Sequence, residues 1–214
     1  FRSLTAQQPI MDKTAFLQHA MRPSAQLFFR SGGSSGVPKL AGFTYRDYRR
    51  QMQAAAAGMF AAGLDPAHDK VLNLMYAGNL YGGLLSFFTL LEMLEVTHLP
   101  MGGPHDDDYH EIARTIVNQG VTTLIGMPST LYQLFTREEA ILRDYGGIQK
   151  LLLGGEHMGV AQRDYIHGFG VKTIRSALYG SVDAGPVYTF WHIVLPQAAP
   201  GIVAASIFVF LESL

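Results

Sequence analysis

Apolar and polar positions along this chain change their period several times. Short apolar runs bounded by turn residues predict β-strands, whereas apolar residues spaced three and four apart predict helices. We expect strands within residues 25–30, 39–45, 70–76, 96–100, 121–128, 148–156 and 171–185. We expect helices within residues 44–64, 78–95, 105–120, 128–142 and 160–170. From residue 70 onward the two types alternate, and this order predicts an α/β domain with a mainly parallel sheet flanked by helices.

Two helices differ in how clearly their sequence defines a buried face. In residues 44–64, Thr44 can cap the first turn and Gly63 can close the last. One stripe of that helix holds Tyr48, Met52, Ala55, Met59 and Ala62. The segment LLSFFTLLEML (residues 84–94) is apolar nearly all round, so we expect it to be buried as a core helix and not to form a binding surface.

Composition removes several classes of function. The net charge is −1 and only 15% of the residues are charged, so there is no electrostatic case for wrapping nucleic acid. The chain has no cysteine, which excludes disulfides, thiolate zinc sites and cysteine nucleophiles. It opens on Phe1 without a signal peptide pattern, and we expect it to be part of a longer protein.

The stretch FRSGGSSGVPKL (residues 29–40) connects two expected strands in a hairpin-like position. It matches neither the Walker A pattern nor G-x-G-x-x-G. Its backbone N–H groups, its serine hydroxyls and the charge of Lys39 would nevertheless suit phosphate oxygens. From residue chemistry alone, a flexible Gly/Ser connection and a phosphate-binding loop remain equal alternatives.

Three motifs in order resemble one family. RSGGSSGVPKL is similar to the phosphate-binding signature of the acyl-adenylate-forming ligases, nearest to their phenylacetate–CoA ligase and LuxE-like branch. LLLGGEHM (151–158) resembles the family's Gly-Gly-Glu turn, and ALYGSVDAGP (177–186) resembles its Tyr-Gly-x-Thr-Glu segment. IGMPSTLYQL (125–134) is a weaker match. The resemblance covers about residues 15–187.

The resemblance implies ATP-dependent activation of a carboxylic acid to an acyl-adenylate, with Mg²⁺ and with coenzyme A or another thiol as acceptor. It implies that the β- and γ-phosphates are held by Ser31, Gly32, Gly33, Ser34, Ser35, Gly36 and Lys39. It places Gly154, Gly155, Glu156, Tyr179 and Gly180 at the adenine. It assigns Asp183 to the metal and makes Lys39 and Asp183 the catalytic residues.

The segment YAGNLYGG (76–83) lies where this family lines its acid pocket. Tyr76 and Tyr81 are therefore candidate substrate contacts, although a strand-to-helix turn that needs small residues explains the same segment. Val182 stands where the family has a hydroxyl residue. The family's ribose-binding aspartate, hinge and C-terminal lysine domain do not follow. We therefore expect a fragment that holds nucleotide without completing the catalytic cycle, and we leave open whether it is an enzyme.

The composition changes near residue 188, so we divide the chain into a partial AMP-binding ligase domain (1–187) and a hydrophobic tail (188–214). Residues 189–212 resemble the inner-membrane permeases of ABC importers. After Pro196 and Pro200 only 14 residues remain, short of the roughly 20 that span a bilayer. We expect a cytoplasmic protein, with any membrane contact made through this tail. A membrane-associated transport component and a functionless hybrid are the alternatives.

Overall fold

Short runs of branched and aliphatic residues form the centre of the molecule. The computed structural model describes residues 23–31, 38–177, 179–181 and 185–187 of the chain. Five parallel strands pair in the order β4-β3-β5-β6-β7. Their bounds are β3 Lys70–Asn73, β4 Thr97–Pro100, β5 Thr123–Gly126, β6 Lys150–Leu153 and β7 Thr173–Ser176. The expected mainly parallel sheet is therefore confirmed, with each strand shorter than its apolar run.

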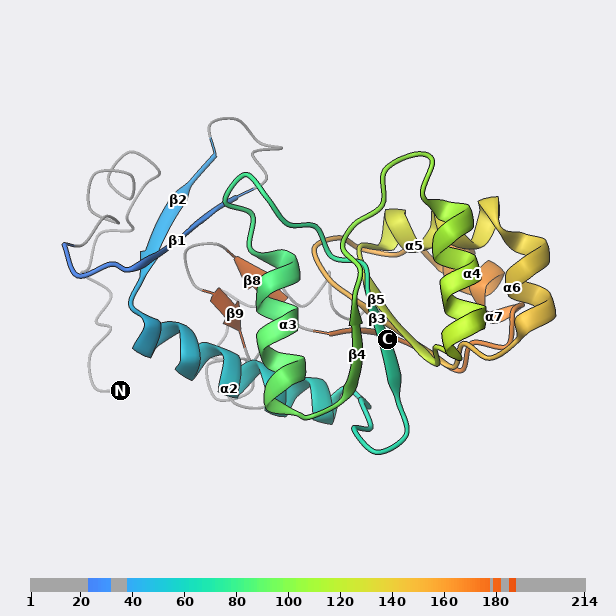
Figure 1. The fold of residues 1–214 in the computed structure, drawn as a ribbon, viewed down its shortest axis with the longest axis horizontal. Coiled ribbons are helices and arrows are strands. Elements are labelled where there is room, and N and C mark those ends of the chain that lie inside the picture. The colour runs from blue at the N-terminus through green and yellow to red at the C-terminus, as the bar shows by residue number, and fades with distance from the viewer. Residues whose placement is uncertain (1–22, 32–37, 178, 182–184, 188–214) are drawn as a thin grey trace, which may run out of the picture.

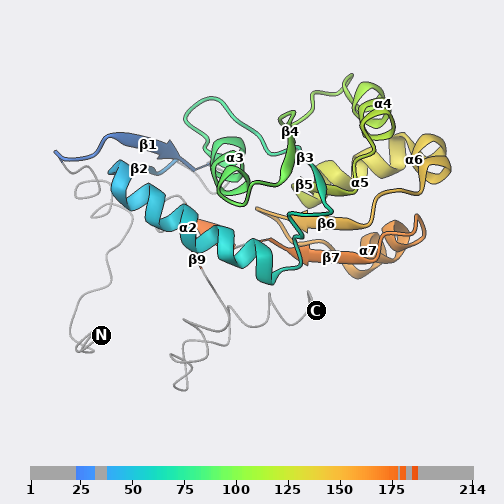
Figure 2. The same ribbon diagram turned by 60° about the horizontal axis from the view of Figure 1, so that its bottom comes forward.

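Helices cover both faces of this sheet (Figures 1 and 2). One face carries α2 Tyr45–Ala61 and α3 Gly83–Met93. The other carries α4 Tyr109–Gln119, α5 Pro128–Arg137, α6 Glu139–Tyr145 and α7 Val160–His167. Side chains alternate between the faces along each strand, so neighbouring residues enter different cores. Val71 packs with α2 and α3, whereas Leu72 packs with the four helices opposite.

The start of α2 follows its sequence signals. The Thr44 hydroxyl accepts a hydrogen bond from the Asp47 N–H at 3.1 Å, which satisfies one of the free donors of the first turn. Met52 and Met59, at the centre of the predicted stripe, are buried. The helix ends at Ala61, and Gly63 then turns the chain with φ +102°.

Two helix predictions were wrong in part. Residues 128–142 do not form one helix, because Glu138 leaves the helical region with φ −114° and ψ 32° and separates α5 from α6. The α3 helix is only half buried: Phe87 lies in the core, but Leu85 and Phe88 are exposed. An apolar sequence without a polar face does not show which side meets solvent.

Two small antiparallel pairs lie outside the central sheet. β1 (Leu27–Arg30) pairs with β2 (Leu40–Phe43), which confirms the hairpin expected around the glycine loop. β8 (Tyr179–Ser181) pairs with β9 (Gly185–Val187), and β9 lies against α2. Residues 188–214, which carry the permease resemblance, lie outside the described residues. Within the described part, none of the helices is long and apolar enough to cross a bilayer.

Candidate active site at the carboxyl edge of the sheet

The order of the strands creates an opening at one edge of the sheet. From β3 the chain passes to β4 on one side, and later to β5 on the other side of β3. The connections that leave the carboxyl ends of β3 and β5 therefore diverge, and in doubly wound sheets ligands bind at such a switch point. Tyr76 follows β3, and Gly154 directly follows β6, at this same edge.

Asn73 shapes the segment that leaves β3. Its side chain is fully buried at the last position of the strand, and its Oδ1 accepts a hydrogen bond from the Met75 N–H at 3.1 Å. Its backbone carbonyl accepts a hydrogen bond from the Gly102 N–H at 2.9 Å, which ties the segment after β4 to the end of β3. A buried amide thus fixes the first turn of the site.

Tyr76 joins the ends of three strands. Its hydroxyl donates to the Pro104 carbonyl at 3.3 Å and shares a 3.3 Å hydrogen bond with the hydroxyl of Thr130 in α5. Its ring lies close to Gly103, where an added Cβ would come within 2.3 Å of a ring atom. Through these contacts Tyr76 connects the segments after β3, β4 and β5. Its side chain is half buried, so it also lines their edge.

The Gly-Gly-Glu turn comes next along this edge. The Gly154 N–H donates to the Gly126 carbonyl at 3.1 Å, and Gly155 has φ +84°, a conformation that favours glycine. The exposed Glu156 carboxylate accepts from the Ser129 N–H at 3.1 Å, in the first turn of α5. A carboxylate is stabilised there because the first N–H groups of a helix have no intrahelical acceptor.

Tyr81 lies close enough to this turn to respond to its charge. Burial raises the pKa of the Tyr81 phenol, and the negative charge of Glu156 raises it further. The two residues are 75 positions apart in the sequence, yet they belong to one electrostatic environment. The structure thus brings Tyr76, Tyr81 and Glu156 to one edge.

The glycine loop is closed at its base by its first and last residues. The Ser31 N–H donates to the Lys39 carbonyl at 2.9 Å, and the Lys39 N–H donates to the Ser31 Oγ at 2.9 Å. The preceding residue, Arg30, donates its N–H to the Leu80 carbonyl at 2.9 Å. The base of the loop is therefore attached to the segment that leaves β3.

Several predicted residues have no described side chain. Tyr179 and Gly180 belong to β8, where they pair with Val187 and Pro186. The remaining predicted residues outside the described ranges are Gly32, Gly33, Ser34, Ser35, Gly36 and Asp183. Their roles remain predictions.

Sequence reasoning missed the residues that hold this edge together. Asn73, Gly103 and Thr130 belong to no signature that binds a ligand, since their contacts come from distant segments. Thr130 lies in the weaker family match, IGMPSTLYQL, which was the one available signal. The edge offers hydroxyls, a carboxylate and phenol rings. These groups suit binding and orientation of a polar ligand.

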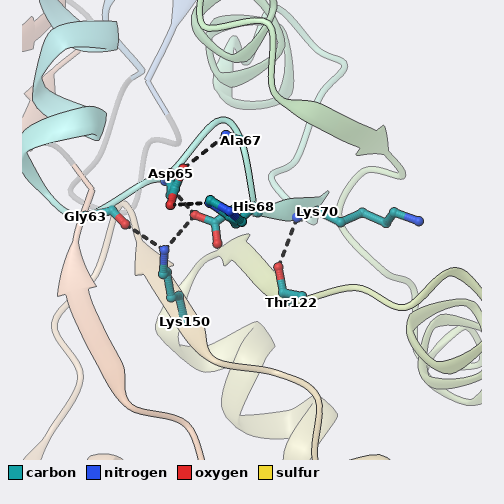
Figure 3. Close-up of polar contacts among 8 residues, drawn as sticks. Gly63, Asp65, Ala67, His68, Lys70, Thr122 and Lys150 are labelled. Carbon is teal, nitrogen blue, oxygen red and sulfur yellow. Dashed lines mark hydrogen bonds and ion pairs between the residues drawn. The ribbon is translucent and has the colours of Figure 1, made fainter.

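Figure 3 shows a polar cluster that lies at the opposite, amino edge of the sheet. Lys150 Nζ donates to the buried Asp69 carboxylate at 2.9 Å and to the Gly63 carbonyl at 2.9 Å. The Asp65 N–H donates to the same carboxylate at 2.7 Å, and a hydrogen bond from His68 lowers the pKa of the Asp65 carboxyl. These contacts tie the α2–β3 connection to β6. Within the described ranges, no three histidine, aspartate or glutamate side chains gather as a metal site.

Comparisons with known proteins find similarity in structure alone. No protein-family model and no curated protein matches the chain. A structure of 2-hydroxyisobutyryl-CoA ligase in complex with 2-HIB-AMP is similar with a TM-score of 0.64, at 19% identity, over 82% of this chain and 39% of that one. The luciferase-like enzyme from the Zophobas morio mealworm is similar with a TM-score of 0.51, at 19% identity, over 84% of this chain and 40% of that one.

A long-chain-fatty-acid-CoA ligase from Archaeoglobus fulgidus is similar with a TM-score of 0.55, at 17% identity, over 76% of this chain and 32% of that one. At these identities the likeness shows a shared fold. The α/β domain described above has the fold of part of these three enzymes. The chain spans between 32% and 40% of the length of the three.

Proposed function

We propose that this chain binds ATP and a small carboxylic acid at the carboxyl edge of its sheet, as part of an acyl-adenylate-forming ligase. One observation carries the proposal. The hydrogen bond from Arg30 to Leu80 attaches the glycine loop to the segment that contains Tyr76 and Tyr81. A loop rich in hydrogen-bond donors suited to phosphate is thereby joined to an edge with aromatic and hydroxyl groups. The structures that share this fold include CoA ligases.

In the proposed reaction, a carboxylate oxygen of the acid attacks the α-phosphorus of ATP. The bond between the α-phosphorus and the bridging oxygen breaks, and pyrophosphate leaves. Backbone N–H groups of the glycine loop and the Lys39 ammonium would stabilise the charge on the departing phosphates. Asp183 would hold Mg²⁺, which supplies further neutralisation of the phosphate oxygens.

At the acid side, Tyr76 and Tyr81 would orient the substrate, and Gly154 and Gly155 would lie along the adenine. The thiol of coenzyme A would then take the acyl group and release AMP. One of the similar structures, of 2-hydroxyisobutyryl-CoA ligase, is a complex with 2-HIB-AMP and CoA. We place the chain nearest to the phenylacetate–CoA ligase branch on the form of its glycine loop. Nucleotide binding is the step that this chain's own residues carry directly.

Isothermal titration calorimetry with ATP and MgCl₂ tests the proposal. We expect saturable binding that weakens at least about tenfold in Lys39→Ala and in Asp183→Ala, equivalent to roughly 1.4 kcal/mol each. Lys172→Ala is the matched control, since Lys172 is exposed at the opposite end of the sheet. The ATP affinity of this variant should equal that of the unchanged protein. Absence of binding, or equal affinity in all three variants, would contradict the proposal.

A further inference from the structure

The glycine loop belongs to a hairpin that is separate from the central sheet. Among the described strands, β1 and β2 pair with each other and with no other strand. The hairpin must therefore be placed relative to the switch point by contacts outside any β-ladder. The hydrogen bond from Arg30 to Leu80 and the packing of Phe29 are two such contacts, and both meet residues 78–82.

Residues 78–81 form a tight turn with an unusual composition. The Tyr81 N–H donates to the Gly78 carbonyl at 2.8 Å, while Asn79 and Leu80 have φ values of +53° and +64°. Two consecutive positive φ values are typical of a type I′ turn, whose second position favours glycine. Leucine in this conformation is strained, and its side chain is 53% exposed, so burial does not offset the strain.

Gly82 is the place where the ring of the hairpin meets the turn. A Cβ added at Gly82 would lie 2.5 Å from two ring atoms of Phe29. The Phe29 ring also contacts the rings of Phe43, at 6.1 Å between centroids, and Tyr48, at 5.9 Å. Because the ring is held on these sides, it cannot move aside freely, and a residue larger than glycine would displace the hairpin.

We propose that the Gly78–Gly82 segment is a seat that positions the glycine loop, with Gly82 and Leu80 as positioning residues for the nucleotide phosphates. The inference rests on the proposed function. The Leu80 carbonyl fixes Arg30, and Ser31, which closes the base of the loop with Lys39, follows immediately. The same turn continues into Tyr81, which lies in the field of Glu156. The seat thereby positions the base of the glycine loop, formed by Ser31 and Lys39, relative to the edge that would bind adenine and acid.

The experiment uses the full chain and two probes that occupy different ends of the proposed site. Inorganic tripolyphosphate with Mg²⁺ reports on the glycine loop, and adenosine reports on the Gly154–Glu156 turn; NMR titration measures both affinities. In Gly82→Ala we expect tripolyphosphate to bind at least about tenfold more weakly and adenosine to bind within about twofold of the unchanged protein. Adding Phe29→Leu should restore tripolyphosphate binding to within about threefold, because the smaller side chain makes room for the methyl group.

Gly170→Ala is the control for stability. Gly170 has φ +88° and open space around it, at the amino end of the sheet, so this change should lower the melting temperature without altering either affinity. Phe29→Leu alone is the second variant should Gly82→Ala not fold. We expect it to weaken tripolyphosphate binding about threefold, since it removes the ring that rests on Gly82.

Unchanged tripolyphosphate affinity in Gly82→Ala, or in Phe29→Leu if Gly82→Ala does not fold, would overturn the inference. An equal loss for both probes would overturn it as well, because a general loss of structure would then explain the result. If the unchanged protein binds neither probe, the proposed function itself fails, and the inference fails with it.

Discussion

Thr123 and His98 each bury a polar atom that finds no partner among the described residues. Thr123 is fully buried at the first position of β5, and its Oγ1 has no hydrogen-bond partner there. His98 lies on β4 with its ring 5.5 Å from that of Phe88, and its Nε2 is buried without a partner. Leaving such groups unpaired costs about 1–3 kcal/mol each in mutational series.

Replacing Thr123 by valine should stabilise the fold. The change keeps the shape of the side chain and removes the unpaired hydroxyl, so we expect the free energy of unfolding to rise by about 1 kcal/mol in urea titration. Thr122→Val is the matched control. The Thr122 hydroxyl accepts from the Lys70 N–H at 2.9 Å, so the same chemical change should lower stability there. Equal effects at the two positions would contradict this explanation.

His98 should make stability depend on pH. Burial lowers the pKa of the His98 imidazole below its ordinary value of 6.5. Below pH 6.5 the His98 imidazole therefore binds a proton in the unfolded chain but stays neutral in the folded chain. The free energy of unfolding falls as the pH falls toward the folded pKa. In His98→Leu, urea unfolding at pH 7.5 and pH 5.5 should differ less than in the unchanged protein. An equal or larger difference in the variant would show that other groups cause the dependence.

At the scale of elements, sequence signals worked where a local pattern determines the outcome. Thr44 caps α2 and Met59 lies in its buried stripe, because capping and periodicity depend on residues a few positions apart. The break at Glu138 and the exposure of Phe88 were not predictable, since both depend on which neighbouring elements pack nearby. The same holds for the candidate site: its motifs were visible, but the contacts of Tyr76 with Pro104 and Thr130 were not.

The turn at residues 78–81 provides a test at this scale. Leu80→Gly should raise the free energy of unfolding by about 0.5–1 kcal/mol, because relief of the left-handed strain exceeds the entropy that glycine adds to the unfolded chain. Gly78→Ala should lower it by about 1 kcal/mol, since Gly78 has φ +91° and no atom near enough to pack against a new methyl group. Thermal unfolding measures the change in stability of both variants. A higher stability in Gly78→Ala would rule out backbone strain as the cause.

Across the whole molecule, the proposed binding residues and the Lys150–Asp69 polar cluster lie at opposite edges of one sheet. The alternation of strands and helices predicts this parallel sheet, and the carboxyl ends of its strands are where α/β proteins bind ligands. The strand order, with β3 between β4 and β5, could not be read from the chain, because pairing is set by contacts over long separations. The ion pair between Lys150 and the buried Asp69 at the amino edge was missed for the same reason.

Lys150→Met tests whether stability at the amino edge is independent of ATP binding at the carboxyl edge. The change leaves the Asp69 carboxylate buried without its cation, and we expect a loss of about 2–3 kcal/mol, slightly under the range for fully buried pairs because Lys150 is 22% exposed. Adding Asp69→Asn should recover much of this loss. His68→Gln, at an 82% exposed position of the same cluster, should change stability by less than about 0.5 kcal/mol.

Urea titration measures these differences, and calorimetry with ATP should show the same affinity in every folded variant of the cluster. A loss of ATP affinity in Lys150→Met that exceeds its effect on the folded fraction would mean that the two edges are coupled.

The contact between Tyr76 and Gly103 also constrains how this chain can diverge. An aromatic ring at position 76 occupies the volume of any side chain at position 103, so substitution at one position requires a change at the other. Relatives that keep tyrosine or phenylalanine at the first position should keep glycine at the second, and those with a small residue at the first are free to vary the second. The two positions should therefore covary across an alignment, although they lie 27 positions apart in the sequence.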